Sequence, residues 1–223
     1  TNAPDLNWVY LWYTDDAFHI KGNGEHSDWS VTATDSLLSD VWEAVKYREK
    51  NNDEEWLVII VTDHGRGNDG HNHGGQSARE RTVWMATNLK KRNAQFGRPT
   101  LSHTDILPTI CEFMDFDVPD DVLYELDGTS FYGKNDIYDL QAAQYDDKAI
   151  LSWKCDNLKA AAWIYMATTN NKATGGKDNW QKVGEVPAPA GSCIIDLKKY
   201  GDSKFYKFAV RTMNNCITRQ LHK

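Results

Sequence analysis

The sequence predicts an α/β layer with a mainly parallel sheet, followed by a small all-β sandwich. Strand and helix patterns alternate in the first part of the chain, whereas only short strands and turns follow residue 147. The 223 residues, of which 40% are hydrophobic and 26% charged, suit one large or two modest folded units. We therefore expect two domains, residues 1–143 and residues 144–223.

The first domain is expected to contain three strands and two helices. Apolar runs of strand length predict buried strands at Trp8–Tyr13, Trp56–Val61 and Thr82–Ala86. Apolar side chains at helical spacing predict helices over Val31–Lys50 and Thr104–Phe113. Five tryptophans are expected in the core of this domain: Trp8, Trp12, Trp42, Trp56 and Trp84.

The second domain is expected to be a sandwich of about six short strands. Turns rich in Asn, Gly, Lys and Pro separate the apolar or alternating runs. These runs span residues 149–153, 162–166, 180–183, 192–197, 205–211 and 216–221. The four cysteines form no Cys-x-x-Cys pair, which argues against a thiolate zinc site or a redox motif and leaves disulfide pairing open.

Charge and hydropathy argue against two classes of partner. The formal net charge is −7, whereas proteins that bind nucleic acid polymers normally carry basic patches. No run approaches the roughly 20 apolar residues that a membrane-spanning helix needs. We expect neither a nucleic acid partner nor a membrane span.

Three polar clusters border the predicted strands of the first domain. Asp15 and His19 follow the first strand, Asp63 and His64 follow the second, and His73 precedes the third. Each cluster taken alone is compatible with a polar loop. Because ligands bind at the carboxyl ends of strands in open α/β sheets, the clusters together predict one site. Asp and His are common zinc ligands, so a metal is the expected occupant.

The clusters resemble motifs of the alkaline phosphatase superfamily, in particular its nucleotide pyrophosphatase/phosphodiesterase-like branch. The family patterns D-x-x-x-H-x-x-G, D-H-G and H-G are matched in order by residues 15–22, 63–65 and 73–74. The resemblance implies the C-terminal part of an alkaline-phosphatase-like catalytic domain, which is a layered sheet with helices.

Two later stretches extend this resemblance. Residues 105–110 and the Asp-Gly-Thr-Ser-Phe stretch at 127–131 are similar to later motifs of the family. The likeness covers residues 5–133. It departs from the family at Phe18, where relatives usually have Gly.

The resemblance implies a centre with two Zn²⁺ ions, or other divalent metals in their place. It assigns Asp15, His19 and His73 to one metal, and Asp63 and His64 to the other. In relatives, an Asp and a Thr or Ser nucleophile from the first half of the domain complete the centre. No segment of this sequence matches them. The resemblance therefore implies a chain that begins after them, with the catalytic nucleophile unknown.

Two further residues near the clusters have roles that the sequence leaves open. His71 is an alternative to His73 as a metal ligand. Arg66 directly follows the Asp63-His64-Gly65 motif, where a guanidinium can bind a substrate oxyanion. The alternative for Arg66 is a solvated surface side chain.

The second domain resembles a fibronectin type III-like sandwich. The segments that carry the resemblance are Leu151-Ser152-Trp153, Trp180, Leu197 and the run Tyr206–Arg211, which matches the pattern around a tyrosine corner. The resemblance implies a spacer, or a module that docks a glycan or a protein. Together with secreted relatives of the first domain, it favours a periplasmic, cell-surface or secreted location.

The expected function is that of a metal-dependent phosphoric-ester hydrolase, of phosphodiesterase or phosphatase type, acting on a small phosphorylated substrate. One alternative is a sulfatase or another transferase of the same superfamily. Sulfatases usually carry Lys-Gly where this chain has His73-Gly74, which counts against that alternative. A second alternative is a non-catalytic binding module on a degenerate or truncated scaffold.

Overall fold

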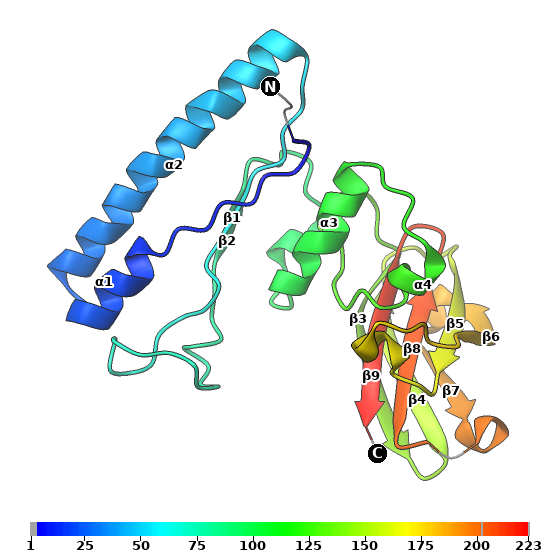
Figure 1. The fold of residues 1–223 in the computed structure, drawn as a ribbon. Coiled ribbons are helices and arrows are strands. Elements are labelled where there is room, and N and C mark those ends of the chain that lie inside the picture. Colours follow the sequence, from blue (N-terminus) through cyan, green and yellow to red (C-terminus); the bar gives the residue numbers. More distant parts are fainter. Residues whose placement is uncertain (1–3, 202, 223) are drawn as a thin grey trace. The chain divides into compact units, whose positions relative to one another are not determined.

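The computed structural model describes residues 4–201 and 203–222 (Figure 1). The chain divides into two compact units, residues 1–89 and residues 90–223. Each unit combines helices with strands, and every strand pairing in the described residues is antiparallel. No described helix is both long and apolar enough to cross a membrane.

The first unit consists of a helical hairpin and a two-stranded sheet (Figure 1). Helix α1 (Tyr13–Lys21) is followed by α2 (Glu25–Asn52), a longer helix than the predicted Val31–Lys50. Strand β1 (Ile59–Val61) pairs with β2 (Met85–Thr87) in an antiparallel ladder. The prediction of a mainly parallel sheet is therefore wrong for the strands that form here.

The predicted strand Trp8–Tyr13 is also wrong, because no strand forms there and α1 begins at Tyr13. Four of the five tryptophans expected in the core are exposed: Trp8 (84%), Trp12 (60%), Trp42 (39%) and Trp84 (56%). The physical reason is that two helices and a two-stranded sheet offer too little surface to bury them. The buried hydrophobic residues among the described part of this unit are Ala17, Val45 and Leu89.

The second unit begins with short helices that two sequence motifs hold together. These elements are the 3₁₀ turns Ala94–Gly97 and His103–Asp105 and the helices α3 (Ile106–Phe113) and α4 (Asp120–Leu123). The buried Asp105 carboxylate accepts a hydrogen bond of 2.6 Å from the Thr129 amide, and the Thr109 hydroxyl accepts one of 3.0 Å from the Phe131 amide. The motifs at 105–110 and 127–131 therefore pack against each other and have a structural role.

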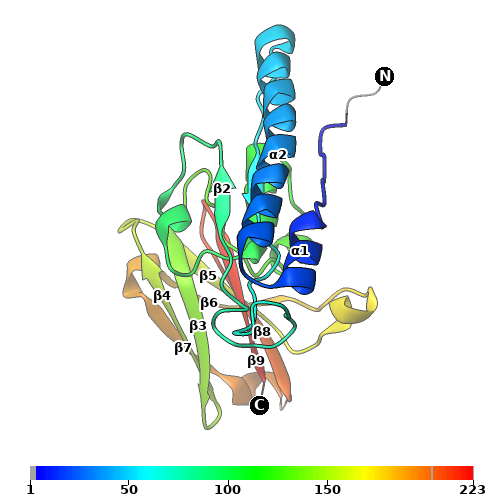
Figure 2. The same cartoon turned by 90° about the vertical axis from the view of Figure 1, so that its left-hand side faces the viewer.

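A sandwich of two antiparallel sheets forms the rest of this unit (Figure 2). One sheet has the order β3-β4-β7 and the other the order β6-β5-β8-β9. Both contribute side chains to one buried core, including Leu151 and Trp153 from the first sheet and Ile164 and Phe208 from the second. The strands are β3 (Ile137–Tyr145), β4 (Lys148–Cys155), β5 (Ala161–Ala167), β6 (Gln181–Pro187), β7 (Ser192–Asp196), β8 (Phe205–Arg211) and β9 (Cys216–His222).

All six strands that the sequence predicts after residue 147 are present, but β3 was not predicted. It crosses the expected domain boundary at residues 143 and 144. The segment before β3 also packs on the sandwich, since the Tyr124 ring stacks on that of Tyr165 with 4.7 Å between centroids. The four cysteines are free thiols. Burial raises the pKa of Cys193 to about 11.

Tyr206 forms the corner contact that the sequence pattern indicates. Its hydroxyl accepts a hydrogen bond from the Ser203 amide (3.1 Å) and donates one to the Gly201 carbonyl (3.4 Å). We expect Tyr206→Phe to lower the free energy of unfolding by about 1 kcal/mol, because the ring still fills the core while these bonds are lost. Urea unfolding measures this difference. Tyr145→Phe, at a side chain that is 70% exposed, is the matched control and is expected to change nothing.

Candidate metal centre

Asp15, His64 and His73 come together in the first unit, although they are far apart in the sequence. Asp15 lies in the first turn of α1, His64 follows β1, and His73 lies in the loop that leads toward β2. Asp15 Oδ1 is 3.7 Å from His64 Nε2 and 3.6 Å from His73 Nε2. One ligand atom of each residue lies within 4.8 Å of the others. All three side chains are about 30% exposed, so the cluster is accessible from solvent.

His19 joins this cluster through helix α1. It follows Asp15 by four residues, a spacing that places both side chains on the same helix face. His19 Nε2 is 3.5 Å from Asp15 Oδ2, and the His19 ring centroid is 5.0 Å from that of His73. The sequence was expected to place these two residues just beyond a strand, but a helix brings them together instead.

Asp63 lies at the solvent side of the cluster. Its Oδ1 atom is 3.6 Å from His64 Nε2, and its side chain is 68% exposed. All five predicted ligands are therefore connected by short distances. His64 Nε2 lies at nearly the same distance from Asp15 Oδ1 (3.7 Å) as from Asp63 Oδ1 (3.6 Å), so the described residues show no division into two separate ligand sets. The division of these residues between two metals stays a prediction.

Hydrogen bonding favours one tautomer of His64. Its Nδ1 atom is 2.9 Å from the Gly65 carbonyl oxygen, which can only accept a hydrogen bond. Nδ1 therefore carries the proton, and the lone pair lies on Nε2, the atom that faces Asp15 and His73. The His64 and His73 rings stack with their centroids 3.7 Å apart. This backbone contact is the kind that orients histidine ligands at metal centres.

The cluster fits a divalent metal by its chemistry and spacing. Zinc takes carboxylate and imidazole ligands at about 2.0–2.1 Å in a tetrahedral arrangement, which places ligand atoms about 3.4 Å apart. The distances of 3.6 and 3.7 Å from Asp15 Oδ1 to the two histidines are close to this spacing. A set of three ligands leaves one position open, as in catalytic zinc sites.

Arg66 and His71 take positions that the sequence did not resolve. The Arg66 side chain is only 11% exposed, so the alternative of a solvated arginine is wrong. Its guanidinium donates hydrogen bonds to Asp15 and to the His71 carbonyl oxygen. His71 turns toward the end of α1, with Nδ1 3.2 Å from the His19 carbonyl oxygen. No pattern in the sequence signals the contacts of Arg66 with Asp15 and of His71 with His19, because each joins residues about 50 positions apart.

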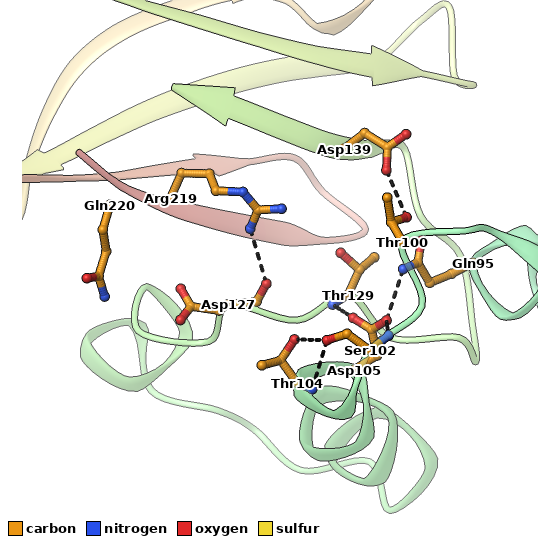
Figure 3. A pocket seen from close by; sticks show the side chains of 10 residues that line it. All are labelled: Gln95, Thr100, Ser102, Thr104, Asp105, Asp127, Thr129, Asp139, Arg219 and Gln220. Atoms are coloured by element: carbon orange, nitrogen blue, oxygen red, sulfur yellow. Dashed lines mark hydrogen bonds between the residues drawn. The ribbon is translucent and has the colours of Figure 1, made fainter. Parts of the chain in front are cut away.

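A polar pocket of about 490 Å³ lies in the second unit and shares no residue with the cluster (Figure 3). Its acidic groups already have partners. Asp105 accepts hydrogen bonds from Gln95 and Ser102, and Asp139 accepts one from Thr100. The Asp127 carboxylate accepts a hydrogen bond from the Thr218 hydroxyl, and Arg219 contacts the Asp127 carbonyl oxygen. The pocket therefore offers few free groups for chemistry, and the cluster around Asp15 is the stronger candidate site.

Comparison with known proteins assigns neither a family nor a function to this chain. No family model matches the chain, and no curated protein is significantly similar to it. Solved structures with some similarity include two crystal structures of pectate lyase Pel3 from Pectobacterium carotovorum. The one with a single monomer in the asymmetric unit is 18% identical, with a TM-score of 0.27, over 35% of this chain and 23% of that chain. The one with two monomers is 20% identical, with a TM-score of 0.29, over 39% of this chain and 26% of that chain. The matched region is about a quarter of each lyase chain, and likenesses of this size carry no argument about fold or function.

Proposed function

We propose that this protein is a metal-dependent phosphoric-ester hydrolase of the alkaline phosphatase superfamily, with a fibronectin type III-like module after the catalytic part. The observation that carries the proposal is the convergence of Asp15, His64 and His73 on ligand atoms within 4.8 Å of one another. These residues come from three motifs that resemble those of the superfamily. His19 and Asp63 extend the cluster on two sides.

The chemistry of the residues supports hydrolysis of a phosphoric ester. A divalent ion such as Zn²⁺ bound there would act as a Lewis acid that polarises a phosphoryl oxygen. Asp15, His64 and His73 would hold the ion, and the Nδ1 bond of His64 keeps Nε2 free for this purpose. Asp63, on the exposed side, would join a second metal ligand set.

The strand order supports the fibronectin type III-like assignment. Sheets of order β3-β4-β7 and β6-β5-β8-β9 correspond to a seven-stranded sandwich with three strands facing four. The corner tyrosine Tyr206 sits at the start of the sixth strand, as in sandwiches of this class. We propose that this module is a spacer or docks a glycan or a protein.

Cobalt substitution tests the proposal, because tetrahedral Co²⁺ has visible absorption bands. We expect the protein to bind one or two equivalents of Co²⁺ or Zn²⁺, with bands that shift when inorganic phosphate enters the open position. Zinc-dependent hydrolysis of bis(p-nitrophenyl) phosphate or p-nitrophenyl phosphate is the activity readout. His73→Ala is expected to remove both signals. Thr82→Ala, a substitution on an exposed hydroxyl of the same unit, is a control that should keep them.

The outcomes separate the proposal from its alternatives. Turnover of a phosphate ester that requires the metal supports it. Turnover of p-nitrophenyl sulfate without turnover of phosphate esters would favour a sulfatase. Metal binding with no turnover of either ester would favour a non-catalytic binding module on a degenerate or truncated scaffold, because no segment of this sequence matches the superfamily's nucleophile. Failure to bind any divalent metal would reject the metal centre.

A further inference from the structure

We propose that Arg66 is a positioning residue that joins the three chain segments of the metal centre and holds the Asp15 carboxylate in its ligating orientation. This inference rests on the proposed function, since it concerns the same centre. It differs from the oxyanion-binding role that the sequence left open for Arg66. The evidence lies in the contacts, the burial and the chemistry of the guanidinium.

The two ends of the guanidinium reach two different segments. Nη2 donates to the Asp15 carboxylate oxygen Oδ1 and, at 2.9 Å, to the Asp15 carbonyl oxygen. Nη1 donates to the His71 carbonyl oxygen at 2.8 Å. Arg66 itself is only two positions from His64. One side chain therefore connects helix α1, the loop that carries His64 and the loop that carries His73.

The backbone around Arg66 is fixed, so the guanidinium has a firm base. The Gly65 amide donates to the Glu80 carbonyl oxygen at 2.7 Å, and the Gly67 amide donates to the Asn72 carbonyl oxygen at 2.8 Å. A side chain at position 65 would meet the Arg79 carbonyl oxygen at 2.1 Å, which only glycine avoids. The loop between β1 and β2 therefore places Arg66 at a set distance from Asp15.

Asp15 Oδ1 can accept the Arg66 hydrogen bond and bind a metal ion at the same time. It accepts the Arg66 hydrogen bond and also faces His64 Nε2 and His73 Nε2 at 3.7 and 3.6 Å. A carboxylate oxygen has two lone pairs, so one serves the guanidinium while the other is directed at the metal position. Second partners of this kind orient metal-binding carboxylates, and their loss typically costs about 10–100-fold in metal affinity.

Phe18 supports the guanidinium from helix α1. The Arg66 Cζ atom lies 5.3 Å from the centre of the Phe18 ring, within range of a cation–π contact. Phe18 is also the position at which this sequence departs from the family pattern that its motifs resemble. The pairing of an aromatic ring at 18 with an arginine at 66 gives that departure a physical role. A lysine could not reproduce the set of contacts, because it lacks the planar fork of donors.

Metal affinity, measured with the metal alone, tests the inference without any need for turnover. We expect Arg66→Ala to weaken Zn²⁺ binding about 10–100-fold by calorimetry and to change the visible bands of bound Co²⁺. Arg66→Lys should be impaired as well, since it keeps the charge and loses the fork. Added guanidinium ion at millimolar concentration should restore part of the affinity to Arg66→Ala. Arg81→Ala, at an exposed arginine of the same loop region, is the matched control and should bind as the wild type does.

Each result decides the question. Wild-type Zn²⁺ affinity and unchanged Co²⁺ bands in Arg66→Ala, together with weaker phosphate binding, would overturn the positioning role and assign Arg66 to the substrate. Wild-type Zn²⁺ affinity in Arg66→Lys would also overturn the positioning role. Circular dichroism separates a loss of fold from a loss of ligand geometry, and the guanidinium rescue applies only to the latter. If the wild-type protein binds no metal, the proposed function fails before Arg66 is in question.

Discussion

Replacing Asp15 with Asn is expected to weaken Zn²⁺ binding by more than about 100-fold, beyond the effect of losing an outer partner. Asp15 is the residue on which the cluster converges: its carboxylate lies 3.5–3.7 Å from His19, His64 and His73. An amide of the same shape removes the negative charge that offsets a divalent ion. It also presents Arg66 with a weaker acceptor. Calorimetric titration of Zn²⁺ into the purified protein measures the change.

Asp16→Asn is the matched control for this experiment. Asp16 is the next residue of α1, it is exposed, and the same chemical change is made there. We expect it to leave the Zn²⁺ affinity unchanged. The assignment of Asp15 as a ligand would be wrong if both variants bind equally well. If Asp15→Asn keeps its affinity while His73→Ala loses it, the histidines alone make the centre.

The sequence predicted the residues of the candidate site more accurately than the secondary structure around them. The positions of Asp15, His64 and His73 are marked by short motifs in a fixed order, and the structure brings these residues together. The secondary structure predicted around Asp15 and His19 was wrong, since these residues lie on a helix and not at the end of a strand. An i, i+4 spacing fits one helix face as well as it fits a loop, so the spacing alone does not decide between them.

The remaining errors in the prediction arise where the structure of a segment depends on the segments that pack against it. Trp8 belongs to an apolar run that reads as a buried strand, but burial needs a facing layer, which the first unit does not supply. Strand β3 was missed because its burial pattern is irregular: a break in register with β4 lies between Tyr138 and Gln141, near the left-handed residue Asp139. The contacts of Arg66 with Asp15 and of His71 with His19 join residues about 50 positions apart, so they depend on tertiary structure and have no counterpart in local sequence.

A buried group of charges holds the second unit together and gives the largest expected effect on stability. Lys207 of β8 is 3% exposed, and its Nζ atom lies 2.5 Å from Glu125 Oε2 and 2.8 Å from Asp178 Oδ2. Glu125 also accepts a hydrogen bond from the Trp180 indole at 3.2 Å. The group links the segment after α4 to the sandwich. The resulting connection explains why the segment before β3 belongs to the same compact unit.

Lys207→Met is expected to lower the free energy of unfolding of the second unit by about 3–5 kcal/mol, because it leaves the carboxylates of Asp178 (0% exposed) and Glu125 (14% exposed) without their cation. Lys182→Met is the matched control. Lys182 lies on β6 of the same sheet and pairs with Glu185 at 2.6 Å, but both side chains are about half exposed. An exposed pair contributes about 0–1 kcal/mol. Equal losses in the two variants, measured by urea unfolding, would show that the buried group is no stronger than a surface pair.

The pH dependence of the Lys207→Met effect has a definite sign. Burial opposes ionisation of Asp178, but hydrogen bonds from Lys207, Thr169 and the Asn171 amide hold the pKa of this carboxyl well below its usual range. A lowered pKa in the folded state means that the stabilisation is present above the unfolded pKa, about 3.9, and is lost as the pH falls below it. The wild type should therefore lose stability more steeply than Lys207→Met between about pH 5 and pH 2. The difference between the two proteins should shrink in acid, since a protonated Asp178 needs no cation. A difference that stays constant down to pH 2 would mean that Lys207 stabilises the fold through packing of its aliphatic stem and not through its charge.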